Sequence, residues 1–240
     1  MTLGLSPGNF CIWGLSVREI SIFADESGDK TEKTRYFLLT LVFHDQADSI
    51  AEQVAVYERS LATADLPNIP FHSEPLLNGH GDYENLGPRQ RKKLLSGFGA
   101  LVRYLPIEYV TFVYKRREFD SPEKLGDHMK RDTSGYLTDH LEYFQGFEHV
   151  KVYYDNAQPI VKNALYNAVY EVLSKQAVER RRTTMTEYRL SQVADYLCTI
   201  ELAAVKYVAK ENGGTYDKFF GGIGSFKKNW LKQARRKRIG

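Results

Sequence analysis

Apolar and polar positions along the chain predict two strands at its start. The run Ile-Ser-Ile-Phe-Ala at 20–24 is apolar and ends in acids followed by Ser27-Gly28, which predicts a strand and then a turn. A second apolar run at 36–43 predicts another strand. The polar, glycine-containing segment between the two runs favours an antiparallel hairpin.

Beyond the hairpin, the pattern predicts helices and strands in alternation. Three-to-four-residue periodicity predicts helices, and short runs rich in Val and Tyr predict strands. Three prolines and a glycine-rich segment at 78–87 predict a long loop after the first helix. We expect helices at 47–64, 89–104, 125–144, 160–175, 190–208 and from 225 onward, and strands at 107–114, 149–154 and 183–189. This order predicts an α/β fold, a mixed β-sheet flanked by helices.

Length and composition indicate one globular domain. The chain has 240 residues, 42% of them hydrophobic and 26% charged, and no stretch is apolar for long enough to cross a bilayer. Cys11 and Cys198 fit neither a disulfide framework nor a zinc site, so we expect a reducing, cytoplasmic location and no membrane partner. We expect a loose tail at 1–17, the domain at 18–212, and a glycine-rich link with a basic helix at 213–240.

Charge is divided unevenly along the chain. Residues 218–240 hold 8 of the 33 Lys and Arg and none of the 30 Asp and Glu, which leaves 25 bases against 30 acids before them. A basic end can neutralise phosphates and hold a nucleic acid near an acidic site. We therefore expect contacts to nucleic acid from Lys227, Lys228, Lys232, Arg235 and Arg236; the alternative is an ordinary solvated helix.

Carboxylates stand at the ends of two predicted strands. Asp25 shares a strand face with Phe23, whereas Glu26 points to the opposite face. Asp155 directly follows the strand at 149–154. An ionised carboxylate in a half-buried strand is costly unless a cation or hydrogen bonds compensate it. Either acid could instead be an ordinary turn or capping residue.

Further acids occur on the late helix and in the proline-broken segment. Asp195 lies within the helix at 190–208, at the edge of its apolar side, where Asp has poor helix propensity and no capping role. Glu201 is nearer the middle of that side, as a second site acid or a buried ion-pair partner. Glu74 stands in an irregular segment beside His72, and Glu84 is its substitute. Acids that converge repel one another, and hard oxygen ligands favour Mg²⁺ or Mn²⁺.

Four motifs together resemble a bacterial family of largely uncharacterised proteins defined by an Asp-Glu-Ser-Gly motif and assigned to the ribonuclease H-like superfamily. They are Ala-Asp-Glu-Ser-Gly-Asp at 24–29, Phe-His-Ser-Glu at 71–74, Tyr-Tyr-Asp-Asn-Ala-Gln at 153–158 and Gln-Val-Ala-Asp at 192–195. The resemblance covers most of the chain from residue 20. It implies a ribonuclease H-like fold with helical insertions.

The resemblance also implies a metal-dependent nuclease. Asp25, Glu74, Asp155 and Asp195 would hold two Mg²⁺ or Mn²⁺ ions that hydrolyse a phosphodiester bond in RNA or DNA. His72 is a candidate for proton transfer, although a loop histidine is more often simply exposed. The alternative is a non-catalytic nucleic-acid-binding or regulatory module of a defence or toxin-like system, with a protein partner or a second copy of the chain.

Overall fold

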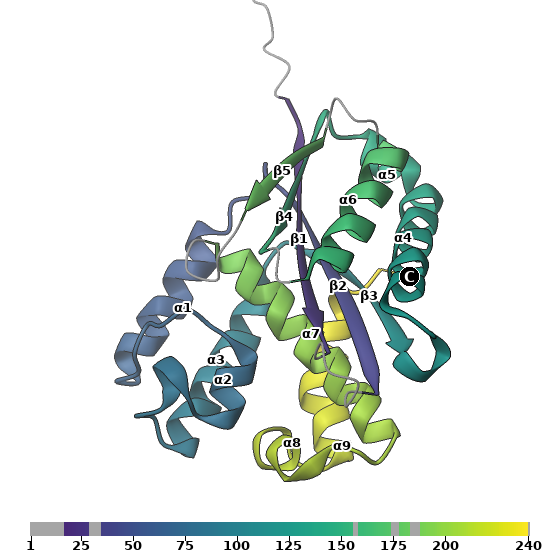
Figure 1. Cartoon of the computed structure of the whole chain (residues 1–240). Helices are drawn as coiled ribbons and strands as arrows, with labels where there is room; N and C mark the ends of the chain where they lie inside the picture. Colours follow the sequence, from purple (N-terminus) through teal and green to yellow (C-terminus); the bar gives the residue numbers. More distant parts are fainter. Residues whose placement is uncertain (1–16, 29–34, 156–157, 174–177, 183–187, 240) are drawn as a thin grey trace, which may run out of the picture.

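The computed structural model describes residues 17–28, 35–155, 158–173, 178–182 and 188–239. A five-stranded sheet forms its centre, with strand order β3-β2-β1-β4-β5 (Figure 1). The strands are β1 (Glu19–Ser27), β2 (Tyr36–Asp45), β3 (Glu108–Lys115), β4 (His149–Tyr154) and β5 (Val178–Arg182). Because β2 alone runs antiparallel to its neighbours, the sheet is mixed. This order and these directions confirm the expected α/β fold, with a mixed sheet flanked by helices.

Side chains of the central strands alternate between two cores, one on each face of the sheet. Phe23 and Val42 enter the first core, whereas Ile22, Ala24 and Phe43 enter the second. Both faces are buried because β1 and β2 are apolar along almost their whole length. The acids that follow at the end of β1 therefore belong to opposite faces.

Most of the helices cover the first core. They are α1 (Ala51–Thr63), α2 (Ser73–Asn78), α3 (Pro88–Tyr104), α7 (Arg189–Val208) and α8 (Gly213–Phe220). A continuous helical run closes the same side, made of α9 (Ile223–Phe226), a π-helical turn at Lys227–Leu231, α10 (Lys232–Ala234) and a last turn at Arg235–Lys237. We call residues 223–237 the C-terminal helical run. Helix α7 lies directly against β1 and β2.

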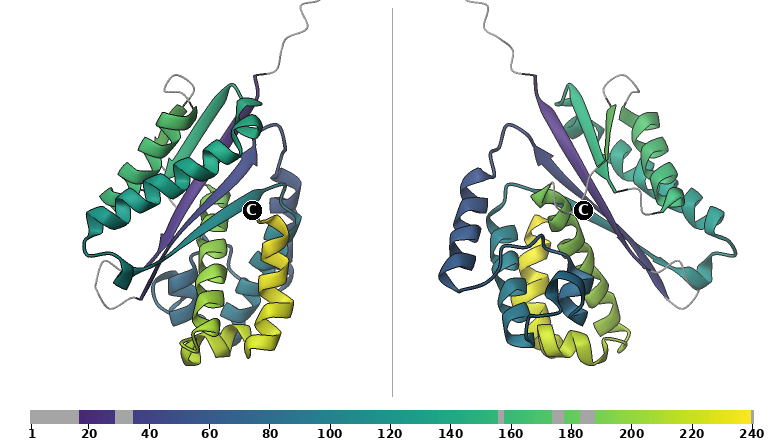
Figure 2. Two further views of the ribbon diagram at one scale, coloured as in Figure 1. Left: turned by 90° about the vertical axis from the view of Figure 1, so that its right-hand side faces the viewer. Right: turned by 60° about the vertical axis from the view of Figure 1, so that its left-hand side comes forward.

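The second core lies under three helices on the other face (Figure 2). They are α4 (Pro122–Asp139), α5 (Leu141–Gln145) and α6 (Pro159–Leu173). The single helix expected at 125–144 is thus two helices, which meet at His140. Among the described residues, no helix is both long and apolar enough to span a membrane.

Several predicted boundaries were wrong. The last strand was expected at 183–189, but β5 occupies 178–182 and Arg189 already begins α7; residues 183–187 are outside the described part. An edge strand with the sequence Val-Glu-Arg-Arg-Arg has too few apolar positions to be recognised by pattern. The expected loop at 78–87 includes a 3₁₀ turn at Gly81–Tyr83, and the expected link after 212 contains α8. The tail expected at 1–17 lies, except for Val17, outside the described residues.

Candidate active site

Asp25 and Asp155 lie at neighbouring strand ends. The parallel pairing of β1 with β4 ends at Phe23 and Tyr153, an offset of 130 residues (153 − 23), and continuing this offset by two residues would place position 25 beside position 155. Strands that run in parallel end at one edge of the sheet, so the fold brings these two acids to the same edge. Asp25 is half-buried on the α7 side, and Asp155 is exposed.

The turn after Asp25 requires glycine. Gly28 has φ +131°, and a Cβ atom there would lie 2.8 Å from the carbonyl oxygen of Tyr36. Any other residue would therefore meet both a disfavoured backbone conformation and a steric clash. Ser27-Gly28 thus ends β1 immediately beyond the two acids, as the sequence predicts.

Asp195 faces this strand end from the second turn of α7. Its side chain is 7% exposed, and its Oδ2 accepts a 2.6 Å hydrogen bond from the backbone amide of Ser73. Cys198, three residues further along the helix, is near Asp25 as well: burial and then the Asp25 charge raise the pKa of its thiol. One face of α7 therefore closes over Asp25.

The acids act on one another electrostatically. Burial raises the pKa of Asp25 well above its ordinary value, and the charges of Asp195, Glu26 and Asp155 raise it further, in that order. Burial also raises the pKa of Asp195, but the charge of His72 and the hydrogen bond from the Ser73 amide oppose this rise. Four carboxylates thus share one neighbourhood, in which the charges of the other three disfavour ionisation of Asp25.

Glu26 borders the same cluster from the other face of the sheet. Tyr154 and Gln158 hydrogen-bond to its carboxylate, and Asp155 repels it. Burial is the largest effect and raises the pKa of Glu26 to about 7. The two side chains therefore point to opposite faces of β1, as predicted. The charge of Glu26 nevertheless raises the pKa of Asp25.

Glu74 is on a regular element, contrary to the irregular segment expected for it. It lies in the first turn of α2 and is exposed, and its carboxylate pairs with His80 Nε2 at 2.8 Å and with Asn78 Nδ2 at 2.7 Å. Burial pushes the pKa of Glu74 upward, but these two hydrogen bonds outweigh it and lower the pKa. Glu74 adds a small repulsion to Asp195. Its substitute, Glu84, is exposed just after the turn Gly81–Tyr83.

Glu201 is a buried ion-pair partner. Its side chain is 2% exposed and is bound by Arg235 at 2.7 Å and Arg238 at 3.4 Å, while Tyr109 donates a 2.8 Å hydrogen bond to it. Of the two roles considered for Glu201, the structure therefore shows the buried ion pair. Its partners attach the C-terminal helical run and Arg238 to α7 and β3. This also explains why a glutamate occupies the apolar side of α7.

Gln192 begins the Gln-Val-Ala-Asp motif, but the sequence alone predicts no role for its side chain. Its Oε1 accepts a 3.1 Å hydrogen bond from the amide of Phe71 and a 2.8 Å hydrogen bond from Arg189 Nη1. Asp195 accepts a hydrogen bond from the amide of Ser73. The two side chains stand three residues apart on α7 and hold the segment 71–73 against that helix. The Gln-x-x-Asp spacing is visible in the sequence, but its partners, Phe71 and Ser73, lie 121 and 122 residues away along the chain.

The acids fit hard divalent cations by donor type. Asp25, Asp155 and Asp195 provide the oxygen ligands that Mg²⁺ and Mn²⁺ prefer, and two of the three are desolvated enough for a nearby cation to be stabilising. Within the described part of the chain, however, no three His, Cys, Asp or Glu side chains already stand close enough to hold an ion. Side-chain rotation would have to complete a metal site.

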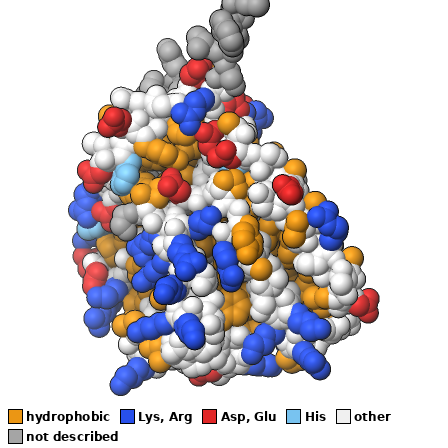
Figure 3. All heavy atoms as spheres, turned by 180° about the vertical axis from the view of Figure 1, so that it is seen from behind, with side chains coloured by type: hydrophobic (Ala, Val, Ile, Leu, Met, Phe, Trp, Pro, Cys, Tyr) orange, Lys and Arg blue, Asp and Glu red, His pale blue; other side chains and the backbone are white. Residues whose placement is uncertain are grey.

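Basic side chains gather away from the acids. Lys227, Lys228, Lys232 and Arg236 are exposed on the C-terminal helical run, and Arg235 is exposed but pairs with Glu201. This run lies on the far side of the molecule in Figure 1, and the opposite view shows Lys and Arg spread over much of that face (Figure 3). Phe226 is fully buried against Tyr207, with ring centroids 4.7 Å apart, so it anchors the run.

Comparison with known proteins finds no family and only a distant structural likeness. No protein-family model matches the chain, and no curated protein matches it. Among solved structures, the chain resembles one from the PCNA:RNase HII complex of Archaeoglobus fulgidus, at 14% identity and a TM-score of 0.40, over 92% of this chain and 91% of that one. A likeness this distant carries no information about activity.

Proposed function

We propose that the protein is a metal-dependent nuclease that hydrolyses phosphodiester bonds in nucleic acid. The observation that carries this proposal is the surroundings of Asp25, whose pKa is raised by burial and by three neighbouring acids. The acids come from the end of β1, the end of β4 and α7. Such an arrangement is expensive for the folded chain unless cations bind there.

In this proposal Asp25, Asp155 and Asp195 hold two Mg²⁺ or Mn²⁺ ions, and Glu74 joins them after leaving its contacts with His80 and Asn78. Bound ions of this kind activate a water and stabilise the leaving oxygen. The Ser73 amide keeps one oxygen of Asp195 fixed, which orients the other. His72 is exposed, acts on the Asp195 charge, and is the candidate for moving a proton.

The test is cleavage of labelled RNA, DNA and RNA–DNA hybrid in Mn²⁺ or Mg²⁺. We expect Asp25→Asn, Asp155→Asn and Asp195→Asn each to lower the rate by more than the roughly hundredfold that loss of an outer-shell partner costs. Asp139→Asn is the matched control, since Asp139 is exposed at the end of α4 on the other face of the sheet. A wild-type protein that cleaves none of the three substrates with either metal overturns the proposal.

A second candidate is a non-catalytic nucleic-acid-binding module, and one observation favours it. Gln192 and Asp195 already have a structural use, since both hold the backbone of 71–73. In this case nucleic acid binding would be salt-sensitive, would persist in EDTA and would survive all the carboxylate substitutions. Retained binding together with absent cleavage in every metal would favour this candidate over the nuclease.

A further inference from the structure

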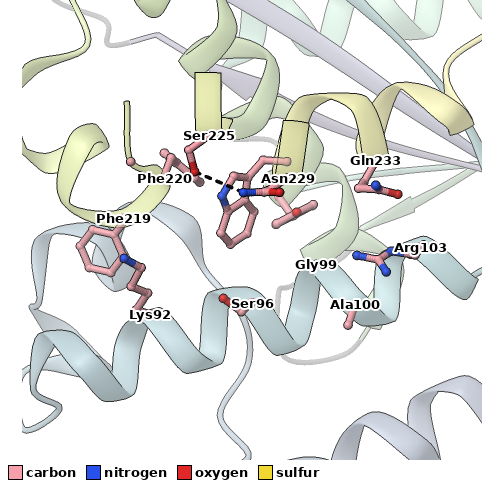
Figure 4. A pocket seen from close by; sticks show the side chains of 13 residues that line it. Lys92, Ser96, Gly99, Ala100, Arg103, Phe219, Phe220, Ser225, Asn229 and Gln233 are labelled. Carbon is pink, nitrogen blue, oxygen red and sulfur yellow. Dashed lines mark hydrogen bonds between the residues drawn. The ribbon is translucent and has the colours of Figure 1, made fainter. Parts of the chain in front are cut away.

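A hollow of about 340 Å³ lies between α3 and the C-terminal helical run, separate from the acids at the sheet edge (Figure 4). Helix α3 provides one wall, with Lys92, Ser96 and Arg103 among its side chains, and the C-terminal helical run provides the other, with Asn229 and Gln233. Its volume lies at the lower end of the range for small-molecule pockets.

The hollow exists because α3 has small residues where it faces the C-terminal helical run. Ser96, Gly99 and Ala100 recur at helical spacing along this side of α3. A Cβ atom at Gly99 would lie 2.6 Å from the hydroxyl of Tyr196 and 3.5 Å from the indole of Trp230. Glycine at this position therefore lets the tyrosine hydroxyl and the indole reach the floor of the hollow.

The lining has positive charges and no negative one among the described residues. Its charged side chains are Lys92 and Arg103, eleven residues apart, or about 16 Å along a helix. Lys92 Nζ donates a 3.4 Å hydrogen bond to the carbonyl oxygen of Lys218, while Arg103 is exposed. Arg103 follows Gly99 by one helical turn, and a Cβ atom at Gly99 would lie beside the Tyr196 hydroxyl, so Arg103 and this hydroxyl line neighbouring parts of the hollow.

The hollow also offers neutral hydrogen-bonding groups. Gln233 Oε1 is buried and has no hydrogen-bond partner among the described residues, and the Tyr196 hydroxyl lies beside Gly99 in the same hollow. Asn229 Nδ2 donates a 3.2 Å hydrogen bond to Ser225 Oγ (Figure 4). The amide oxygen of Asn229 is not used in this bond. Trp230 packs edge-on against Phe220, with ring centroids 5.2 Å apart, and is only partly buried. A ligand with an anionic group, a planar ring and polar hydrogens matches this set.

We propose that this hollow binds a nucleoside monophosphate, with its phosphate at Arg103 and the Tyr196 hydroxyl and its base beside Trp230. The cation of Arg103 and the Tyr196 hydroxyl suit a phosphate, the indole suits a base, and the amides of Asn229 and Gln233 suit ribose and base hydrogen bonds. Tyr196 follows Asp195 directly on α7, but successive residues of a helix point in different directions, so the hollow is separate from the candidate metal site. The site itself requires no catalysis.

Calorimetric titration of the full chain in EDTA tests the proposal, with AMP, UMP, adenosine and inorganic phosphate as separate probes. We expect AMP or UMP to bind at least about tenfold more tightly than adenosine or phosphate alone. Arg103→Gln and Tyr196→Phe should each weaken nucleotide binding about tenfold, because a charge-assisted bond is lost. Tyr196→Phe keeps the ring that packs on Phe71 and Phe98.

Arg89→Gln is the matched control, because it removes one charge from α3 outside the hollow and should leave nucleotide binding unchanged. Three results overturn the proposal: no binding of either nucleotide, nucleotide binding that both pocket variants retain in full, or phosphate binding as tight as nucleotide binding. Binding of a dodecamer of uridylate that Arg103→Gln abolishes, without nucleotide binding, would assign the hollow to a nucleic-acid strand and overturn it as well.

Discussion

At the level of single residues, the ionised acids at the sheet edge make the free energy of folding less favourable. Asp25 and Asp195 both have raised pKa values because burial disfavours their ionised forms, and mutual repulsion adds to this for Asp25. The amide of Ser73 compensates Asp195 in part. Folding therefore becomes less favourable as these groups ionise, unless a cation binds.

Glu26 makes this cost measurable as a pH dependence. Its folded pKa is about 7 against an ordinary 4.5, so between these values the folded state binds more protons than the unfolded state. Stability without metal should therefore be greatest at and below about pH 4.5, as far as this group is concerned, and should fall as the pH rises to about 7. Thermal unfolding in EDTA at several pH values measures this dependence of stability on pH.

The variant Glu26→Gln should flatten this part of the pH profile, because the amide does not titrate and still accepts from Tyr154. Glu179→Gln is a suitable control, since Glu179 is a surface partner of Arg181 on the edge strand. An unchanged pH profile in Glu26→Gln would show that Glu26 titrates at its ordinary pKa.

At the element scale, α7 organises the site because it carries polar residues on its buried side. Gln192 is 3% exposed and accepts from the Phe71 amide. Removing that acceptor leaves a buried amide unsatisfied, so we expect Gln192→Ala to cost about 1–3 kcal/mol of unfolding free energy. Gln192→Glu retains an acceptor and should cost less; equal losses from the two variants in denaturant titrations would contradict this role.

Glu201 joins α7 to the C-terminal helical run in a similar way. Arg235→Ala would leave the buried Glu201 carboxylate with only Arg238 and Tyr109 as partners. We expect the unfolding free energy to fall by about 2 kcal/mol, which is less than for a buried charge left without any partner. Arg236→Ala removes an exposed neighbour and should change stability by less than about 0.5 kcal/mol. Chemical denaturation of both variants distinguishes an anchoring arginine from a merely exposed one.

The sequence could predict elements more readily than side-chain partners. Strand ends at Asp25 and Asp155 follow from local apolar runs, and the burial of Asp195 follows from helical periodicity. The pairing of Glu201 with Arg235, and of Gln192 with Phe71, depends on contacts that no local pattern contains. Edge strand β5 was misplaced for the same reason, since pairing with β4 rather than its own composition makes it a strand.

At the scale of the whole molecule, acids and bases occupy different regions. The acids cluster at one edge of the sheet, whereas the C-terminal helical run contributes exposed lysines to another face (Figure 3). A nucleic acid held by that face would have to extend around the molecule to reach the acids. Charge separation of this kind favours binding of a long substrate over a short one.

Salt dependence tests this arrangement. For a duplex, each lost phosphate contact should reduce the slope of log affinity against log salt by about 0.9. We expect the double variant Lys227→Ala and Lys228→Ala to reduce the slope accordingly, measured by fluorescence anisotropy in EDTA. Lys124→Ala with Lys130→Ala removes the same charge from α4, where both lysines pair with acids, and should have little effect. Equal slopes for the two double variants would show that the basic face does not contact the nucleic acid.

We expect the acids at the sheet edge to bind divalent cations. Titration with Mn²⁺, followed by electron paramagnetic resonance of the free ion, measures this binding without any substrate. We expect two bound ions in the wild-type protein, and loss of at least one in Asp25→Asn and in Asp195→Asn, with Asp139→Asn unchanged. A wild-type protein that binds no Mn²⁺, or binding that both site variants retain in full, would contradict it.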